Sequence, residues 1–382
     1  MEGGAVATAP ILASEGALDM RKMGILAASV ALSLAISIAG LRGHGTGPAL
    51  AGAFRAVRVA SGLASPVGFT FTPGGRLVYL ERHTGWLRFR NLQTDADVRV
   101  HRVLSVNSDG ERGALGVAVH PSWPVKPFVY VFVTRNTANG LRNEVLRIKV
   151  ENDNGVGVKR LLSVAAGPAS NHNGGRIAFG PDGKLYVVIG DNAQPSNSQD
   201  RTGNLRGKIL RVNPDGSIPP TNPSGSRIWA YGIRNSIGFA FDPRNGRLWE
   251  SENGPGCNDE VNRIGRAGNH GWGPSESCPD TNNSGPTPRI KAKHTFVQTV
   301  GLTGLAFCDR CGLGAAFHGD LVVGAVNDGR IRRFDLNANR TGFDAGPVLV
   351  LDRPRPVLSI EVAPNGRLFF SDFDSIYRLA LA

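Results

Sequence analysis

One residue pattern recurs along the chain and constrains its fold more than any other feature of the sequence. An apolar stretch runs into a turn containing Pro or Gly, and a second stretch rich in β-forming residues follows. Each copy has the pattern of a β-hairpin, because turn residues join two short strands. Four clear copies and two variants occur, at residues 69–81, 177–191, 239–253 and 360–372, and at residues 117–133 and 314–326.

The spacing of these copies indicates how the hairpins are assembled. Successive copies lie 52, 56, 63, 73 and 47 residues apart, counted at Leu77, Val129, Leu185, Leu248, Leu321 and Leu368. These intervals leave room for two more strands after each hairpin, so we expect six four-stranded antiparallel sheets. A radial arrangement buries both faces of such sheets and leaves only short edges. We therefore predict an all-β, six-bladed β-propeller as a single domain over residues 46–382, in preference to unrelated hairpins in a sandwich.

Composition supports this reading and excludes other classes. The 382 residues include 50 Gly and 24 Pro, too many for a helical bundle, because both residues interrupt helices. The hydrophobic fraction of 41% is enough for a substantial core. The formal net charge is +12, but the basic residues are scattered and form no run with interleaved aromatic residues. We expect no nucleic-acid partner.

The first 45 residues read as an N-terminal extension that contains a signal peptide. Two basic residues, Arg21 and Lys22, precede the apolar stretch at residues 24–40, which ends in small residues. That order is typical of a secretory signal, and the stretch is short for a membrane span. An uncleaved anchor is the alternative, and it would be the chain's membrane contact. We expect an exported protein, periplasmic or extracellular.

The four cysteines favour two disulfides. An even number in an oxidising compartment points to pairing, and neighbouring positions suggest Cys257 with Cys278 and Cys308 with Cys311. A four-cysteine zinc site is the rival reading, although the paired spacing of a zinc ribbon is absent.

Four polar segments interrupt the strand pattern and are candidates for function. His172 lies between two asparagines and could act as a general base. Arg234, followed by Asn235, offers the rigid fork of donors that suits carboxylates or quinone oxygens. The loop from Glu252 to Asn262 offers carboxylates, amides and carbonyls of the kind that suit Ca²⁺. The remaining segment, residues 111–121, begins with the charged pair Glu111 and Arg112.

In wording and order, these segments resemble the soluble glucose/sorbosone dehydrogenase family, which uses pyrroloquinoline quinone (PQQ). The matching pieces are ERGALGVAVHP, the His172 segment with RIAFGPDGKLYVVIGD, GKILRVNPDGSIP, GIRNSIGFAFDP and NGPGCNDEVNRIGRAGNHGWG. The resemblance runs from about residue 56 to the end of the chain. It implies the six-bladed fold and the oxidation of an aldose at its anomeric hydroxyl, with an external electron acceptor.

The resemblance also implies roles for individual residues. His172 stands where the family has its base, and Arg234 and Asn235 match residues that contact PQQ and polarise its carbonyls. The carbonyls of Gly254 and Pro255 match the ligands of the calcium ion that bridges to PQQ. Glu260 lies in a segment that supports calcium in the family.

Several positions depart from the family pattern. Asn171 stands where a carboxylate often precedes the histidine, and Glu111 replaces an amide near the cofactor. Asn327 and Asp328 occupy the region of a cofactor-binding lysine. Arg353 and Arg355 are the match for two family arginines near the last blade. Some of the positive charge that faces PQQ in the family is therefore expected to be missing here, or to be relocated to Arg112 or Arg330.

Two alternatives to the dehydrogenase therefore stay open. One is a non-catalytic propeller that binds carbohydrate or a protein partner, which the departures motivate. The other is a calcium-dependent hydrolase of the lactonase type, which needs carboxylates from several blades around a central metal. The adjacent pair Asp259 and Glu260 lies in one loop, which places this hydrolase last.

Overall fold

A computed structural model describes residues 53–274, 278 and 285–382. Residues 47–382 form one compact unit, which is the unit described below. The predicted signal peptide or anchor lies outside the described residues. Within those residues, no helix is both long and apolar enough to pass through a bilayer.

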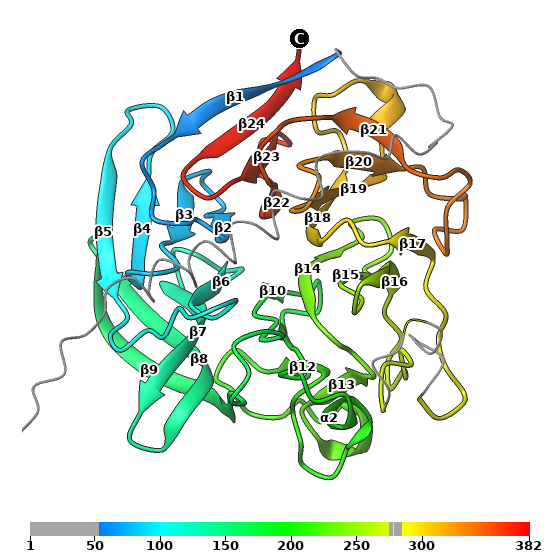
Figure 1. Cartoon of the computed structure of the whole chain (residues 1–382). Coiled ribbons are helices and arrows are strands. Elements are labelled where there is room, and N and C mark those ends of the chain that lie inside the picture. The colour runs from blue at the N-terminus through cyan, green and yellow to red at the C-terminus, as the bar shows by residue number, and fades with distance from the viewer. Residues whose placement is uncertain (1–52, 275–277, 279–284) are drawn as a thin grey trace, which may run out of the picture. The chain divides into compact units, whose positions relative to one another are not determined.

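The predicted six-bladed propeller is confirmed (Figure 1). Six four-stranded antiparallel sheets surround a central axis, and the first strand of each repeat is innermost. The first three blades contain β2 (Gly68–Phe71), β3 (Leu77–Leu80), β4 (Trp86–Arg90) and β5 (Asp97–Arg102); β6 (Ala114–Val119), β7 (Phe128–Thr137), β8 (Gly140–Glu151) and β9 (Asn154–Ala165); and β10 (Ile177–Phe179), β11 (Leu185–Ile189), β12 (Lys208–Val212) and β13 (Ile228–Tyr231). The last three contain β14 (Ser236–Phe241), β15 (Leu248–Glu252), β16 (Cys257–Arg263) and β17 (His294–Gln298); β18 (Leu302–Cys308), β19 (Asp320–Ala325), β20 (Ile331–Phe334) and β21 (Val348–Leu351); and β22 (Ser359–Val362), β23 (Leu368–Ser371), β24 (Ile376–Leu381) and β1 (Phe54–Ala60).

The recurring hairpin is the inner half of every blade. Each of the six positions used to measure the repeat lies in the second strand of its sheet. In the third blade, for example, Phe179 pairs with Leu185 across the turn that the Pro and Gly residues build. The described helices are short: α2 (Ser196–Gln199), η1 (Pro223–Gly225) and η3 (Ala315–Phe317).

The ring is closed by a strand from the beginning of the domain. β1 joins the sixth sheet as its outermost strand and pairs antiparallel with β24, so that Phe54 lies opposite Leu381. Sequence reasoning placed four strands in each blade but did not predict which strand closes the ring.

The core lies between neighbouring sheets. One cluster combines Phe132 of the second blade with Val187 and Leu210 of the third, all nearly inaccessible to solvent. Near the axis the inner strands approach so closely that side chains are excluded. A Cβ atom on Gly116 would lie 2.1 Å from the carbonyl oxygen of Gly175 in the next blade. Gly68, Gly238 and Gly304 make similarly close approaches to the blades that follow them.

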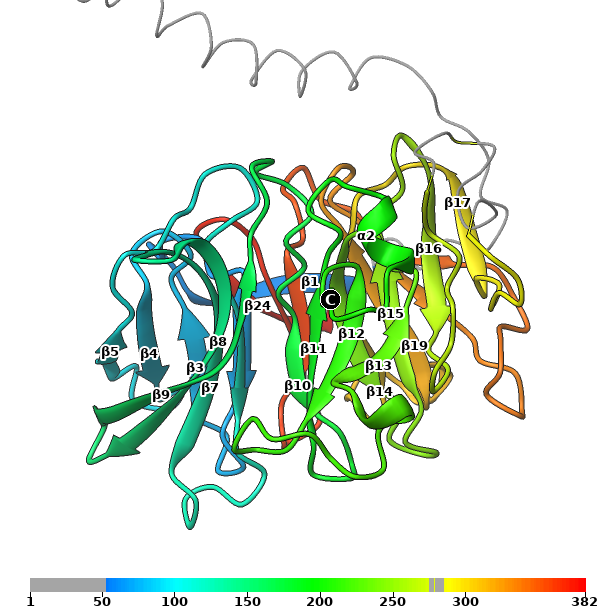
Figure 2. The ribbon, with the colours of Figure 1, turned by 90° about the horizontal axis from the view of Figure 1, so that it is seen from below.

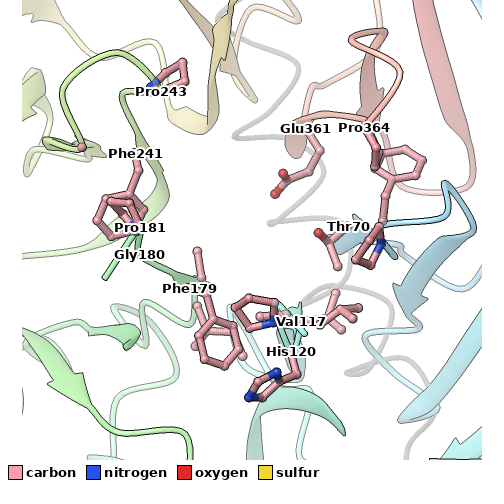
Figure 3. Close-up of a pocket in the computed structure, with 18 of the residues that line it drawn as sticks. Thr70, Val117, His120, Phe179, Gly180, Pro181, Phe241, Pro243, Glu361 and Pro364 are labelled. Atoms are coloured by element: carbon pink, nitrogen blue, oxygen red, sulfur yellow. The ribbon is translucent and has the colours of Figure 1, made fainter. Parts of the chain in front are cut away.

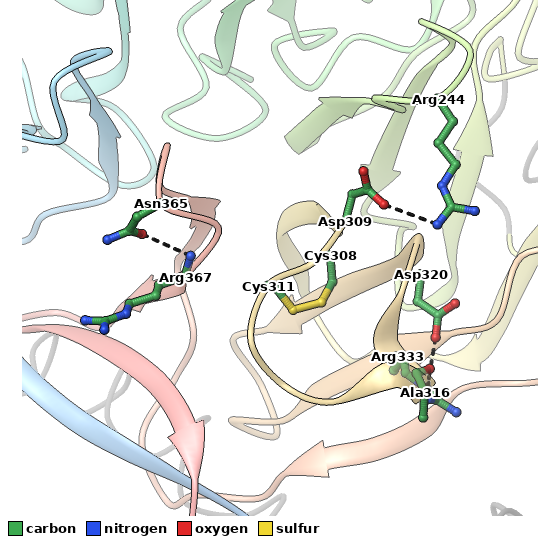
Figure 4. The surroundings of a disulfide bond; sticks show 9 residues. All are labelled: Arg244, Cys308, Asp309, Cys311, Ala316, Asp320, Arg333, Asn365 and Arg367. Carbon is green, nitrogen blue, oxygen red and sulfur yellow. Dashed lines mark hydrogen bonds and ion pairs between the residues drawn. A yellow bond between two sulfur atoms is a disulfide. The ribbon is translucent and has the colours of Figure 1, made fainter.

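Both predicted disulfides are present. Cys257 pairs with Cys278, and Cys308 pairs with Cys311 at the end of β18. The second bond lies in the connection to β19, where Asp309 also accepts a hydrogen bond from Arg244 of the fourth blade (Figure 4).

Candidate functional site

The topology places the candidate residues at one end of the channel. In each blade, the loop entering the innermost strand and the loop between the second and third strands lie at the same end, because the strands alternate in direction. His172 and Asn171 enter β10, Arg234 and Asn235 enter β14, and Glu111 enters β6. Figure 2 shows α2, which belongs to the loop between β11 and β12, at one end of the ring.

A buried carboxylate holds the imidazole of His172. The Nδ1 atom of His172 lies 2.7 Å from Oδ1 of Asp191, and both side chains are almost fully buried. In the tautomer with its proton on Nδ1, the imidazole would donate to this carboxylate, and Nε2 would be left as an acceptor of the kind that a general base requires. Asp191 follows the strand β11, and the sequence analysis did not single it out. It supplies the orienting carboxylate that Asn171 cannot provide.

The backbone at His172 is held in an unusual conformation. Its φ angle is +56°, in the left-handed region that residues other than glycine rarely adopt. Its carbonyl accepts hydrogen bonds from the backbone and side-chain nitrogens of Asn192, at 3.0 and 3.1 Å. A Cβ atom on Gly190 would lie 2.3 Å from that carbonyl. Such local strain is typical of positions where a side chain must be aimed.

Glu111 joins three of the candidate loops. One of its oxygens accepts a hydrogen bond from the backbone nitrogen of His172 at 2.7 Å and another from the side chain of Asn235 at 3.0 Å. The carboxylate therefore links the loops of the second, third and fourth blades. Among the described residues, none forms a hydrogen bond with the side chain of Asn171.

Arg234 lies beside these groups and is nine-tenths buried. Its NH1 atom donates to the carbonyl of Asn253 at 2.8 Å, and its backbone nitrogen donates to Glu252 at 2.6 Å. Its carbonyl accepts a hydrogen bond of 2.8 Å from the backbone of Asp191. The loop after β11, which carries Asp191, and the loop that carries Arg234 are thus connected directly.

The loop after β15 presents the two carbonyls predicted for calcium. The backbone nitrogen of Gly254 donates to Asp259 at 2.9 Å, and the other oxygen of Asp259 accepts from the nitrogens of Val300 and Gly301, each at 2.7 Å. Asp259 therefore fixes the turn that carries the carbonyls of Gly254 and Pro255. Within residues 53–274, 278 and 285–382, no group of three His, Cys, Asp or Glu side chains has the geometry of a metal site.

Glu260 lies in a cluster of buried carboxylates rather than on the loop surface. The side chain of Asn262 donates to Glu250 at 3.1 Å and to Glu260 at 3.2 Å, and Glu252 is opposite Glu260 in the sheet. Burial raises the pKa of Glu260 to about 8 and the pKa of Glu250 above its ordinary value. Burial and the charges of Glu250 and Glu260 raise the pKa of Glu252 well above its ordinary value.

The other predicted arginines are held by partners of their own. Arg353 pairs with Asp372 at 2.9 Å and packs on the ring of Tyr377. Arg355 pairs with Asp372 and with Asp374. Arg112 donates to the carbonyls of residues 167–169, which lead towards His172. The last candidate, Arg330, pairs with Asp352 at 3.1 Å, and Asp328 pairs with Arg332.

A cavity of about 490 Å³ opens at the other end of the channel, among the turns that leave the innermost strands. Figure 3 shows Phe179, His120 and Thr70 around it, with the carboxylate of Glu361 pointing inward. Oε1 of Glu361 lies 4.0 Å from NH1 of Arg176, which reaches it from the third blade. None of the predicted site residues lines this cavity.

Comparison with known proteins identifies the family of the chain. The sequence pattern of the glucose/sorbosone dehydrogenase family matches residues 63–376. The chain belongs to this family. A solved structure described as the PQQ-bound form of an aldose sugar dehydrogenase from Streptomyces coelicolor has a TM-score of 0.74 and 27% identity, and the match covers 86% of this chain and 98% of that one.

Two curated members of the family are similar over part of their length. Quinoprotein glucose dehydrogenase B from Acinetobacter calcoaceticus is 34% identical over 245 residues, which cover 56% of this chain and 51% of the relative. Aldose sugar dehydrogenase YliI from Escherichia coli is 30% identical over 214 residues, which cover 52% of this chain and 56% of the relative. These matches span about half the length of each relative.

Proposed function

We propose that this member of the family is a PQQ-dependent dehydrogenase that oxidises an aldose at its anomeric hydroxyl. The observation that carries the proposal is the His172–Asp191 pair, at the channel end where Arg234 and Asn235 meet it. An electron acceptor outside the protein would complete each turnover. Export through the N-terminal segment is part of the same proposal.

The residues at this channel end fit the cofactor. PQQ is a planar quinone with three carboxylates, and a buried guanidinium is suited to quinone and carboxylate oxygens. Arg234 supplies that group, and Oδ1 of Asn235 is buried without a hydrogen-bond partner among the described residues. Glu111 does not stand as an isolated negative charge, because it accepts two hydrogen bonds. The cofactor, when bound, supplies the hydride acceptor.

The chain's own residues then perform the proton chemistry. The carboxylate of Asp191 fixes the tautomer of His172, so that Nε2 takes the proton of the sugar hydroxyl. Asp191 also stabilises the imidazolium that forms. Arg234 and Asn235 would hold the cofactor and polarise its oxygens. We assign Arg353 and Arg355, the match for two family arginines, to the same cofactor site; each also pairs with an aspartate.

Calcium is a separate part of the proposal. The carbonyls of Gly254 and Pro255 would hold the ion, on a turn that Asp259 stabilises, and Glu260 would support the site from β16. Carbonyl and carboxylate oxygens are the ligands that Ca²⁺ prefers. The ion would act as a Lewis acid next to the cofactor.

Reconstitution tests the proposal. The purified protein is mixed with PQQ and Ca²⁺ and assayed with aldoses and an artificial electron acceptor, while the absorbance of the cofactor is followed. We expect a spectral change and sugar oxidation, and the absence of both would reject the proposal. The His172→Ala variant should bind PQQ and lose turnover. His318→Ala is the control, because this exposed histidine precedes β19 at the other end of the channel.

A further inference from the structure

Trp272 is a fully buried residue that the family resemblance left without a role. Its indole Nε1 donates a 2.7 Å hydrogen bond to Oδ2 of Asp191, the oxygen that does not contact His172. Neither side chain is accessible to solvent. The other oxygen, Oδ1, also accepts a 2.8 Å hydrogen bond from the backbone nitrogen of Ala193, so the indole is the partner that holds Oδ2. A carboxylate held at both oxygens has a defined orientation, whereas one held at a single oxygen can rotate about its last bond.

The position of Trp272 is itself determined by its surroundings. Its backbone nitrogen donates to the carbonyl of Gly232 at 3.1 Å, and its carbonyl accepts a 2.6 Å hydrogen bond from Gln199 in α2. Gly232 has a φ angle of +75° and begins the segment that carries Arg234. A Cβ atom on Gly232 would lie 2.3 Å from the side chain of Asn269, so this packing requires a glycine.

The same indole also contacts the arginine of the site. The guanidinium carbon of Arg234 lies 5.2 Å from the centre of the Trp272 ring, within the range of a cation–π interaction. One edge of the indole therefore binds the partner of the base, and the ring contacts the group proposed to hold the cofactor.

We propose that Trp272 is a positioning residue that holds Asp191, and through it His172, in register with Arg234. This inference rests on the proposed function for its kinetic consequence, but the hydrogen bonds exist without cofactor. Removing the indole N–H would free Oδ2 of Asp191 and leave the carboxylate held through Oδ1 alone, so the orientation of the His172 ring would be less restricted.

The test is a comparison of two tryptophan variants. Trp272→Phe keeps an aromatic ring beside Arg234 and removes the N–H donor. Trp249→Phe is the matched control, because Trp249 is equally buried and its Nε1 has no hydrogen-bond partner among the described residues. We expect kcat of Trp272→Phe to fall about 10- to 100-fold, the range for one hydrogen bond to a charged group, with KM for the sugar little changed. The control should keep both constants.

A second measurement separates this inference from the proposed function. Nuclear magnetic resonance of the cofactor-free protein, with nitrogen-labelled histidine, should show a hydrogen-bonded Nδ1–H proton on His172. That signal should shift or broaden in Trp272→Phe and stay unchanged in Trp249→Phe. If the wild-type protein shows no sugar oxidation, the proposed function is rejected, but the inference about Trp272 is not. Equal behaviour of the two variants in this spectrum would overturn the inference.

Should Trp272→Phe not fold, a closer replacement keeps the inference testable. Benzothienylalanine has the shape of tryptophan, with sulfur in place of the N–H. Placed at position 272, it should cause the same change in the His172 signal. An unchanged signal with this residue would also overturn the inference.

Discussion

At the candidate base, the contact between Nδ1 of His172 and Oδ1 of Asp191 is the feature on which the proposed chemistry depends. In the proposed mechanism, the carboxylate of Asp191, 2.7 Å from Nδ1 of His172, leaves Nε2 of the ring available to the substrate. It lies nineteen positions after the histidine, and an antiparallel sheet brings the two together. His172 therefore obtains its carboxylate partner from the end of the neighbouring strand β11.

Replacement of this carboxylate by an amide gives the first prediction. Asp191→Asn keeps the size of the side chain, but an amide can donate to Nδ1 and favour the wrong tautomer of His172. We expect kcat to fall by about 10²-fold or more, because general-base catalysis contributes about 10² to 10⁴. Affinity for PQQ, measured by calorimetry, should change little. An unchanged kcat would contradict the assigned role.

A second residue-scale prediction concerns Glu361 at the other end of the channel. Burial raises its pKa to about 7 from an ordinary value of 4.5, against the lowering effect of Arg176. The unfolded chain thus loses this proton at lower pH than the folded protein. The contribution to stability is fully present below the unfolded value and is lost as pH rises from about 4.5 to about 7.

Glu361→Gln should therefore reduce the decrease in Tm between pH 5 and pH 8, as measured by thermal denaturation. The side chain is 31% exposed, so the change should be small, about 2 °C or less. The exposed variant Glu151→Gln is the control. An equal effect in both variants would show that the cavity carboxylate is not responsible.

The element that aims His172 is the loop between β9 and β10. This loop contains two glycines with positive φ, and one of them, Gly174, packs directly on the backbone of β11. A Cβ atom there would lie 2.8 Å from the nitrogen of Gly190 and 2.9 Å from the carbonyl oxygen of Val188. The loop can adopt this backbone path only because residue 174 is a glycine, which has no side chain.

A matched pair of glycines tests this requirement. Gly174 and Gly183 have nearly the same φ, +67° and +68°, but a Cβ atom on Gly183 would meet nothing within 4 Å. Gly183→Ala should cost only the backbone strain, about 1–2 kcal/mol of unfolding free energy. Gly174→Ala should cost more and should also lower kcat. Chemical denaturation and the sugar assay measure the two effects, and equal losses of stability would argue against close packing at Gly174.

The elements themselves were well predicted, because their signals are local. The two strands and the turn of each inner hairpin span only 13 to 24 residues, and the sheets form where the repeat places them. The partners of the site were not predicted. Asp191 ends one copy of the recurring hairpin pattern, and nothing in that copy distinguishes it from the others. Trp272, which donates to Asp191, lies 81 positions later in the sequence. Such contacts depend on how neighbouring blades pack, which a hairpin pattern does not encode.

At the scale of the whole domain, stability depends on the closure of the ring. Each blade packs between two others, so an opening at one junction exposes apolar surface on both sides. The junction between the sixth and first blades differs from the rest, because its sheet combines β1 with three strands from the end of the chain.

Two truncations measure the contribution of β1. Removal of residues 1–52 leaves this strand in place, whereas removal of residues 1–60 deletes it and exposes the edge of β24. Exposed edges pair with other chains, so we expect the longer truncation to lower Tm and to promote aggregation. Calorimetry and light scattering would show this. Equal behaviour of the two proteins would mean that β1 is dispensable.

Closure by β1 also determines when the ring can be completed during protein synthesis. Phe54 and Leu381 are opposite each other in the sheet but are made 327 residues apart. During translation β1 therefore has no partner strand until β24 has emerged. Contacts of such long range are slow to form, because the chain entropy between them must be lost first. A chain that lacks β24 leaves β1 without its partner strand, so the sixth sheet can be completed only after β24 has been made.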